Sequence, residues 1–203
     1  MLVGDQVIGR VRYFLGVTTV IILPLGLLYW IVIHLWARRW RALGPIRTYL
    51  IVLPVLAALG ALLFRFRGPL LGEDLGTNGI LIGIALVLWC VMTWLEFQYW
   101  RQLNIATLVG IPELSQHRKG KLLRDGIYGV VRHPRYLSAG IGLIANTLII
   151  NHVGLYILVL LALPPGYMLL VLEERELVDR FGEAYREYQR EVPCLIPRLP
   201  RAR

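Results

Sequence analysis

The chain has 203 residues, of which 57% are hydrophobic, and its mean hydropathy is +0.60. This composition is too apolar for an ordinary soluble domain and is typical of a protein that crosses a membrane several times. The net charge of +9 comes from 22 Lys and Arg against 13 Asp and Glu, which in a membrane protein indicates loops facing anionic lipids.

The first half of the chain predicts three membrane spans, at about residues 13–36, 46–64 and 79–100. Each has the roughly 20 apolar residues that a helix needs to cross the hydrocarbon core. The first two spans contain Pro24 and Pro54, which we expect to bend them. We expect residues 1–100 to hold these spans and residues 101–203 to hold the rest of one membrane domain.

A long polar segment at 101–135 precedes an apolar run at 136–172, which is too long for a single span. The pair Asn151 and His152 is the natural place for a turn, so the run predicts a helical hairpin that forms the fourth and fifth spans. The predicted fold is therefore all-α, an integral membrane protein with about five transmembrane helices and one further helix.

That further helix is predicted at 173–191, where apolar residues recur every three or four positions among charged ones. We expect it to be amphipathic, to fold back under the membrane domain and to stop before Pro193. With five spans, 18 of the 22 Lys and Arg residues fall on one side of the membrane. The positive-inside rule then predicts an outside N-terminus and a cytoplasmic C-terminus.

The segment from Gly120 to Tyr136 is the most polar and turn-rich part between the two apolar blocks. Pro134 suits the first turn of a helix, and a proline pushes the residue before it, His133, out of the helical conformation. The unpaired N–H groups of that first turn favour an anionic ligand. The sequence therefore predicts an anion-binding helix start at the membrane surface.

Several residues have two open interpretations. Glu173 and Glu174 can be a solvated helix start or carboxylates that bind a cation at the membrane edge. His133 can contact lipid headgroups, and His34 can line a polar cavity or bond to another helix. Cys90 and Cys194 lack metal-ligand spacing and do not suggest a disulfide, so we predict no metal site.

Two motifs taken together resemble a known family. The first motif reads Leu122-Leu123-x-x-Gly126-Ile127-Tyr128-x-x-x-Arg132-His133-Pro134-x-Tyr136. The second reads Glu173-Glu174-x-x-Leu177-x-x-x-Phe181-Gly182-x-x-Tyr185-x-x-Tyr188-x-x-x-Val192-Pro193. This pair of motifs, with an apolar hairpin between them, resembles the isoprenylcysteine carboxyl methyltransferases and their phospholipid-methylating relatives. The resemblance covers roughly residues 113–197.

The resemblance implies an S-adenosylmethionine-dependent membrane methyltransferase that needs no catalytic side chain. A lone pair on a small lipophilic or lipid acceptor, arriving from the bilayer, would attack the methyl carbon at the cytoplasmic face. Matching positions one by one, the resemblance implies these cofactor-binding residues: Glu113, Lys121, Leu122, Leu123, Tyr128, His133, Pro134, Arg135, Tyr136 and Glu173. The ammonium group of the cofactor suits Glu173, and Tyr185 or Tyr188 could cover its adenine.

One position departs from the family pattern. The prenylcysteine enzymes have a substrate-binding arginine four residues before the cofactor glutamate, where this chain has Leu169. This departure argues against a prenylcysteine carboxylate as the acceptor and favours a neutral, amine, thiol or hydroxyl group. Besides the acceptor, membrane lipids are the expected partners. No nucleic-acid partner is expected, because nothing in the chain resembles a nucleic-acid module.

Two other functions fit the same motifs. Membrane reductases of the sterol type carry an Arg-His-Pro-like motif and bind NADPH, although they are generally larger. A non-catalytic membrane protein could also keep the fold and use its basic face to bind lipids or partners. Binding of S-adenosylhomocysteine, of NADPH or of neither separates the three possibilities.

Overall fold

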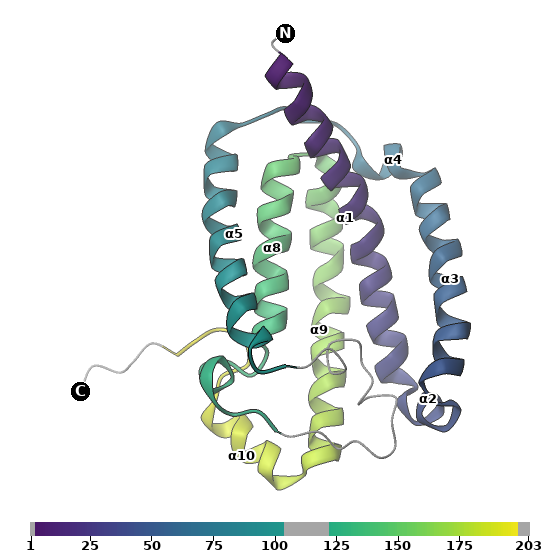
Figure 1. The fold of residues 1–203 in the computed structure, drawn as a ribbon, viewed down its shortest axis with the longest axis vertical. Coiled ribbons are helices and arrows are strands. Elements are labelled where there is room, and N and C mark those ends of the chain that lie inside the picture. The colour runs from purple at the N-terminus through teal and green to yellow at the C-terminus, as the bar shows by residue number, and fades with distance from the viewer. Residues whose placement is uncertain (1–2, 104–121, 199–203) are drawn as a thin grey trace, which may run out of the picture.

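The computed structural model describes residues 3–103 and 122–198, and every regular element in these ranges is helical. In chain order the elements are α1 (Val3–Leu35), α2 (Ala37–Leu43), α3 (Pro45–Arg65), α4 (Arg67–Leu71), α5 (Gly79–Trp100), the 3-10 helix η1 (Gly126–Gly129), α8 (Pro134–Ile150), α9 (Val153–Phe181) and α10 (Glu183–Glu191). The long helices lie side by side as a bundle (Figure 1). The all-α prediction is confirmed for the described residues.

Four helices, α1, α3, α5 and α9, are long and apolar enough to cross a membrane. The fourth predicted span corresponds to α8, which has 17 residues and lies between α5 and α9 (Figure 1). That length is at the lower end of the range for a span. Most large side chains on the outside of the bundle are apolar, as a surface in contact with lipid requires.

The predicted helical hairpin is confirmed, and its turn lies at Asn151 and His152. Asn151 ends α8 in the left-handed conformation, with φ of 50°, which asparagine tolerates better than most residues. Its side chain donates to the carbonyl of Gly76 at 2.9 Å, and Tyr156 donates to its side-chain oxygen at 2.9 Å. The segment after α4 therefore holds the hairpin turn in place.

Arg12 of α1 is buried at the same end of the bundle. It donates to the carbonyl of Ile150 at 2.8 Å and pairs with Asp74, so that it covers the negative end of the α8 dipole. Burial would raise the pKa of Asp74, but hydrogen bonds from Gly76 and Arg12 lower it overall. This ion pair joins the first helix, the connector before α5 and the end of α8.

The tail differs from the prediction in one respect. The helix expected at 173–191 is not one separate element, because α9 continues from the hairpin without a break as far as Phe181. The chain turns at Gly182, whose φ of 61° and ψ of −132° suit glycine, and α10 then folds back. The fold-back and the stop before Pro193 are as predicted.

The structure gathers the arginine-rich segments at one end of the bundle. There α2, the last turns of α9 and α10 lie together, whereas the N-terminus and α4 lie at the other end (Figure 1). Tyr185, Tyr188 and Val192 form a small apolar core at the arginine-rich end, against which Leu122 and Phe181 pack. This core fixes α10 and the segment before η1 beneath α9.

Candidate functional site

The start of α8 has the geometry that the sequence predicts. His133 lies outside the helix with φ of −122° and ψ of 63°, Pro134 is the first helical residue, and no described side chain caps the helix. The backbone N–H groups of Arg132 and His133 donate to the carbonyls of Pro193 and Cys194 at 2.9 and 3.1 Å. The C-terminal segment is thereby tied to the entrance of α8.

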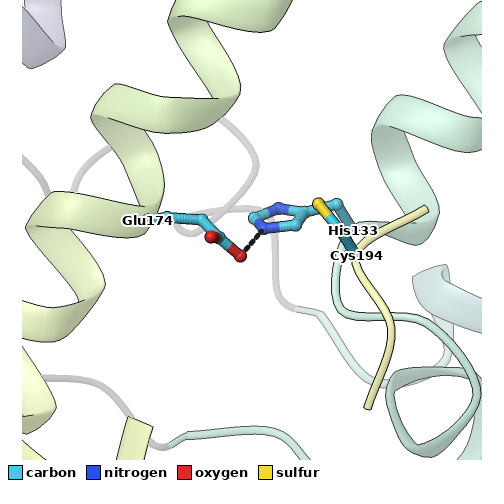
Figure 2. Close-up of side chains that lie close together, drawn as sticks. All are labelled: His133, Glu174 and Cys194. Carbon is cyan, nitrogen blue, oxygen red and sulfur yellow. Dashed lines mark hydrogen bonds and ion pairs between the residues drawn. The ribbon is translucent and has the colours of Figure 1, made fainter. Parts of the chain in front are cut away.

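Glu174 is the centre of a buried hydrogen-bond network at this point. One of its oxygens, Oε1, accepts from two nitrogens of Arg132 at 2.7 and 2.8 Å and lies 3.1 Å from Nε2 of His133. The other oxygen accepts from the side chain of Gln189 at 3.0 Å. Figure 2 shows Glu174 reaching from α9 towards His133, with Cys194 beside the imidazole.

Arg132 connects this network to the end of α10. It donates to the backbone carbonyls of Gln189 and Val192, so the same guanidinium covers the C-terminus of α10 and neutralises Glu174. Burial alone would lower the pKa of Arg132, but the hydrogen bond and charge of Glu174 raise it overall. The group is therefore a permanent cation inside the site.

His133, Glu174 and Cys194 are also residue types that bind metals, and their ligand atoms lie within 4.8 Å of one another. Two observations speak against a metal here. The Glu174 oxygen that faces His133 already accepts from the Arg132 guanidinium. Burial and the charge of Glu174 raise the pKa of Cys194, which favours the thiol over the thiolate that metals bind. We interpret the cluster as an ion pair.

Glu173, which the resemblance selects as the cofactor glutamate, points elsewhere. It makes no hydrogen bond or ion pair with any described residue, although it is only partly exposed. Burial raises the pKa of Tyr128, and the charge of Glu173 adds to that effect while Arg135 opposes it. The side chains of Glu173 and Arg135 therefore both lie within electrostatic reach of Tyr128.

Most of the predicted cofactor residues meet at this end of the bundle. Leu122 packs beside the tyrosines of α10, Tyr128 lies in η1, and residues 133–136 form the entrance to α8. His133 and Tyr136 contact each other edge to face at 5.5 Å between ring centroids. Glu113 and Lys121 lie outside the described residues. Leu123 is partly buried, and Leu169 is buried within α9.

Two expectations need correction or extension. Tyr185 and Tyr188 do not form a movable cover, because only 1% and 2% of their surfaces are exposed and they belong to the core. The roles of Glu174 and Gln189 were not foreseen. Successive residues of a helix point about 100° apart, so the two adjacent glutamates face different neighbours. The sequence shows the pair, but only the packing shows which one faces His133.

The arrangement defines a helical membrane protein with a polar site where two helices of a hairpin reach the membrane surface. The family model described as phospholipid methyltransferase matches residues 79–184, which is more than half of the chain. The chain belongs to this family of membrane methyltransferases. The match includes α5, the hairpin and the predicted cofactor residues, and it leaves out α1 to α4 and most of α10.

Two curated relatives support this assignment. The chain is 34% identical over 88 residues to a protein-S-isoprenylcysteine O-methyltransferase of Schizosaccharomyces pombe, covering 42% of this chain and 37% of that protein. It is 32% identical over 108 residues to methanethiol S-methyltransferase 1 of Bradyrhizobium diazoefficiens, covering 47% and 35%. The chain thus matches little more than a third of the length of each relative. No solved structure matches it significantly.

Proposed function

We propose that this chain transfers a methyl group from S-adenosylmethionine to a lipophilic acceptor at the cytoplasmic face of a membrane. The observation that carries the proposal is the 3.1 Å contact of Glu174 with His133, the residue before the uncapped helix start at Pro134. This contact brings the neighbouring Glu173, which has no partner among the described residues, to the same end of the hairpin. The membership of a methyltransferase family supports the same chemistry.

The charges of the site residues suit such a cofactor. Its carboxylate suits the first turn of α8, where the helix dipole is positive, and its ammonium group suits Glu173. Leu122 and the apolar core of α10 offer a surface for an adenine ring. The contacts of Arg132 with Glu174 and with the Gln189 carbonyl tie the segment before α8 to α9 and α10.

When bound, the cofactor supplies an electrophilic methyl group that the acceptor attacks in line, with S-adenosylhomocysteine leaving. The protein orients the two reactants, and well-oriented reactants can gain about 7 kcal/mol or more over reactants free in solution. Arg135 supplies a positive charge near Glu173 and Tyr128 that can attract a negatively charged acceptor group. A thiolate or carboxylate acceptor needs no general base.

The two relatives act on different acceptors by name, one on a prenylated cysteine and the other on methanethiol. Leu169 stands where the resemblance places the arginine that binds a prenylcysteine carboxylate, and its side chain is apolar and buried. This residue favours an acceptor other than a carboxylate, and a thiol has precedent in the second relative.

The direct test compares thermal stabilisation of the purified protein by S-adenosylhomocysteine and by NADPH. We expect stabilisation by the first compound and none by the second. Stabilisation by NADPH alone would show a reductase, and stabilisation by neither would show a non-catalytic protein. Incubation of membranes with methyl-labelled cofactor, followed by mass spectrometry of the lipid extract, then identifies the acceptor.

A further inference from the structure

A groove of about 670 Å³ lies between α1 and α3, within the size range of small-molecule pockets. Its aromatic end is formed by Tyr29, Trp30 and Tyr49. The rest of the groove, farther along the two helices, is aliphatic and includes Ile22, Leu25 and Leu53. Because both helices precede residue 79, the groove lies outside the part of the chain that matches the family.

The packing of α1 on α9 fixes the height of this groove relative to the site. Arg12 bonds to the carbonyl of Ile150 just before α9 begins, and His34 bonds to Glu176 near the end of α9 at 2.7 Å. The two helices therefore run in the same direction. Trp30 lies about 6 Å before His34 and Glu173 about 4.5 Å before Glu176, so both lie at nearly the same depth.

Trp30 belongs both to the groove and to the surroundings of the candidate site. The guanidinium of Arg135 lies 5.7 Å from the centre of the Trp30 ring, a cation–π contact between α8 and α1. His34 also stacks on this ring, at 5.7 Å between ring centroids, and bonds to Glu176. The aromatic end of the groove thus adjoins Arg135, which follows Pro134 at the start of α8.

The side chain of Glu173 faces the same region. On α9, Glu176 points towards α1, whereas Glu174 points towards His133 and α10. A helix turns about 100° per residue, so Glu173 points between these two directions, about 60° from Glu176. The carboxylate therefore faces the space between α1 and the start of α8, where Arg135 contacts Trp30.

We infer that the groove between α1 and α3 binds the apolar chain of the methyl acceptor. The reactive end of the acceptor extends past Trp30 towards Arg135 and Glu173, and the chain lies along Leu25 and Leu53. The groove opens between two membrane spans, so an acceptor dissolved in the bilayer reaches it without entering water. This inference rests on the proposed function and assigns its acceptor selectivity to helices outside the family match.

Gly26 offers a test that leaves the packing intact. It lines the groove, and a Cβ atom at this position meets nothing within 4 Å. Gly26→Leu therefore adds a side chain to the groove with no clash at its Cβ atom. Gly83→Leu is the matched control, because Gly83 is an exposed glycine of the membrane helix α5 and also has open space around it.

The probe is a long-chain alkanethiol with a photoreactive diazirine in its chain, added to the full chain in detergent micelles and mapped by mass spectrometry. We expect labelling of α1 and α3 within the groove, competed by unlabelled long-chain thiol and not by methanethiol. Gly26→Leu should reduce this labelling at least ten-fold, and Gly83→Leu should leave it unchanged.

S-adenosylhomocysteine binding, measured on the same samples, separates the two claims. Labelling that is not competed, or that persists in Gly26→Leu while S-adenosylhomocysteine binds, shows a bulk lipid surface and overturns the groove assignment alone. If the wild-type protein does not bind S-adenosylhomocysteine, the proposed function is wrong, and this inference is wrong with it. Unchanged S-adenosylhomocysteine affinity in Gly26→Leu, together with lost labelling, supports both.

Discussion

Neutralising Glu174 should destabilise the protein more than almost any other single charge change. In Glu174→Gln the shape is kept, but Arg132 remains buried without a counter-charge, since only 10% of its side chain and 19% of that of Glu174 are exposed. Breaking a buried ion pair on one side costs roughly 3–5 kcal/mol. For a chain of this size, a loss of about 3 kcal/mol lowers the melting temperature by roughly 6–12 °C.

The assay is thermal unfolding of the purified protein in detergent micelles. Glu187→Gln is the control, because Glu187 pairs with Arg124 at 3.7 Å on the surface, where 58% of its side chain is exposed. A double variant with methionine at both Arg132 and Glu174 should recover much of the lost stability, since apolar pairs can replace buried ion pairs. If Glu174→Gln melts within about 2 °C of the control, the reasoning on this network is wrong.

Three further predictions concern stability. Gly154→Ala should lower the melting temperature, because a Cβ there meets the backbone carbonyls of Leu70 and Leu71, whereas Gly83→Ala should not, since its surroundings are open. Burial raises the pKa of Tyr188 to about 12, so the unfolded chain loses this proton first and the contribution of Tyr188 to the free energy of unfolding should fall by roughly 2 kcal/mol between pH 10 and pH 12. Chemical unfolding at several pH values measures the slope, and Tyr188→Phe should reduce it. Arg12→Met should cost roughly 1–3 kcal/mol through the lost hydrogen bonds to the end of α8, and an unchanged unfolding midpoint would contradict this.

The fold was largely predictable because the membrane imposes strong rules on the sequence. The length of apolar runs gave the spans, and the pair Asn151 and His152 gave the hairpin turn, since a 37-residue apolar run cannot be one span. The continuation of α9 to Phe181 was not predictable from periodicity, because an apolar helix and an amphipathic one joined end to end leave no boundary signal. Gly182 was the only cue to the break, and its meaning depends on a backbone angle.

The candidate site was predictable at the level of segments more than of side chains. Pro134 fixed the start of α8, and the hairpin required Glu173 and Glu174 to lie near it. It was not predictable that Glu174 rather than Glu173 contacts His133, because this depends on which neighbours surround each side of α9. Arg132 bonds to the backbone carbonyls of Gln189 and Val192, and the Gln189 side chain bonds to Glu174. These residues lie far apart in the sequence, so no local sequence pattern predicts the network.

The central claim is that Glu173 and the start of α8 together bind S-adenosylmethionine, and calorimetric titration with S-adenosylhomocysteine tests it most directly. Loss of one hydrogen bond to a charged group costs about 1.5–3 kcal/mol, so Glu173→Gln should bind roughly 10-fold to 100-fold more weakly than the wild type. Its melting temperature without ligand should stay the same, because Glu173 has no partner among the described residues. Equal affinity in the two proteins would contradict the account.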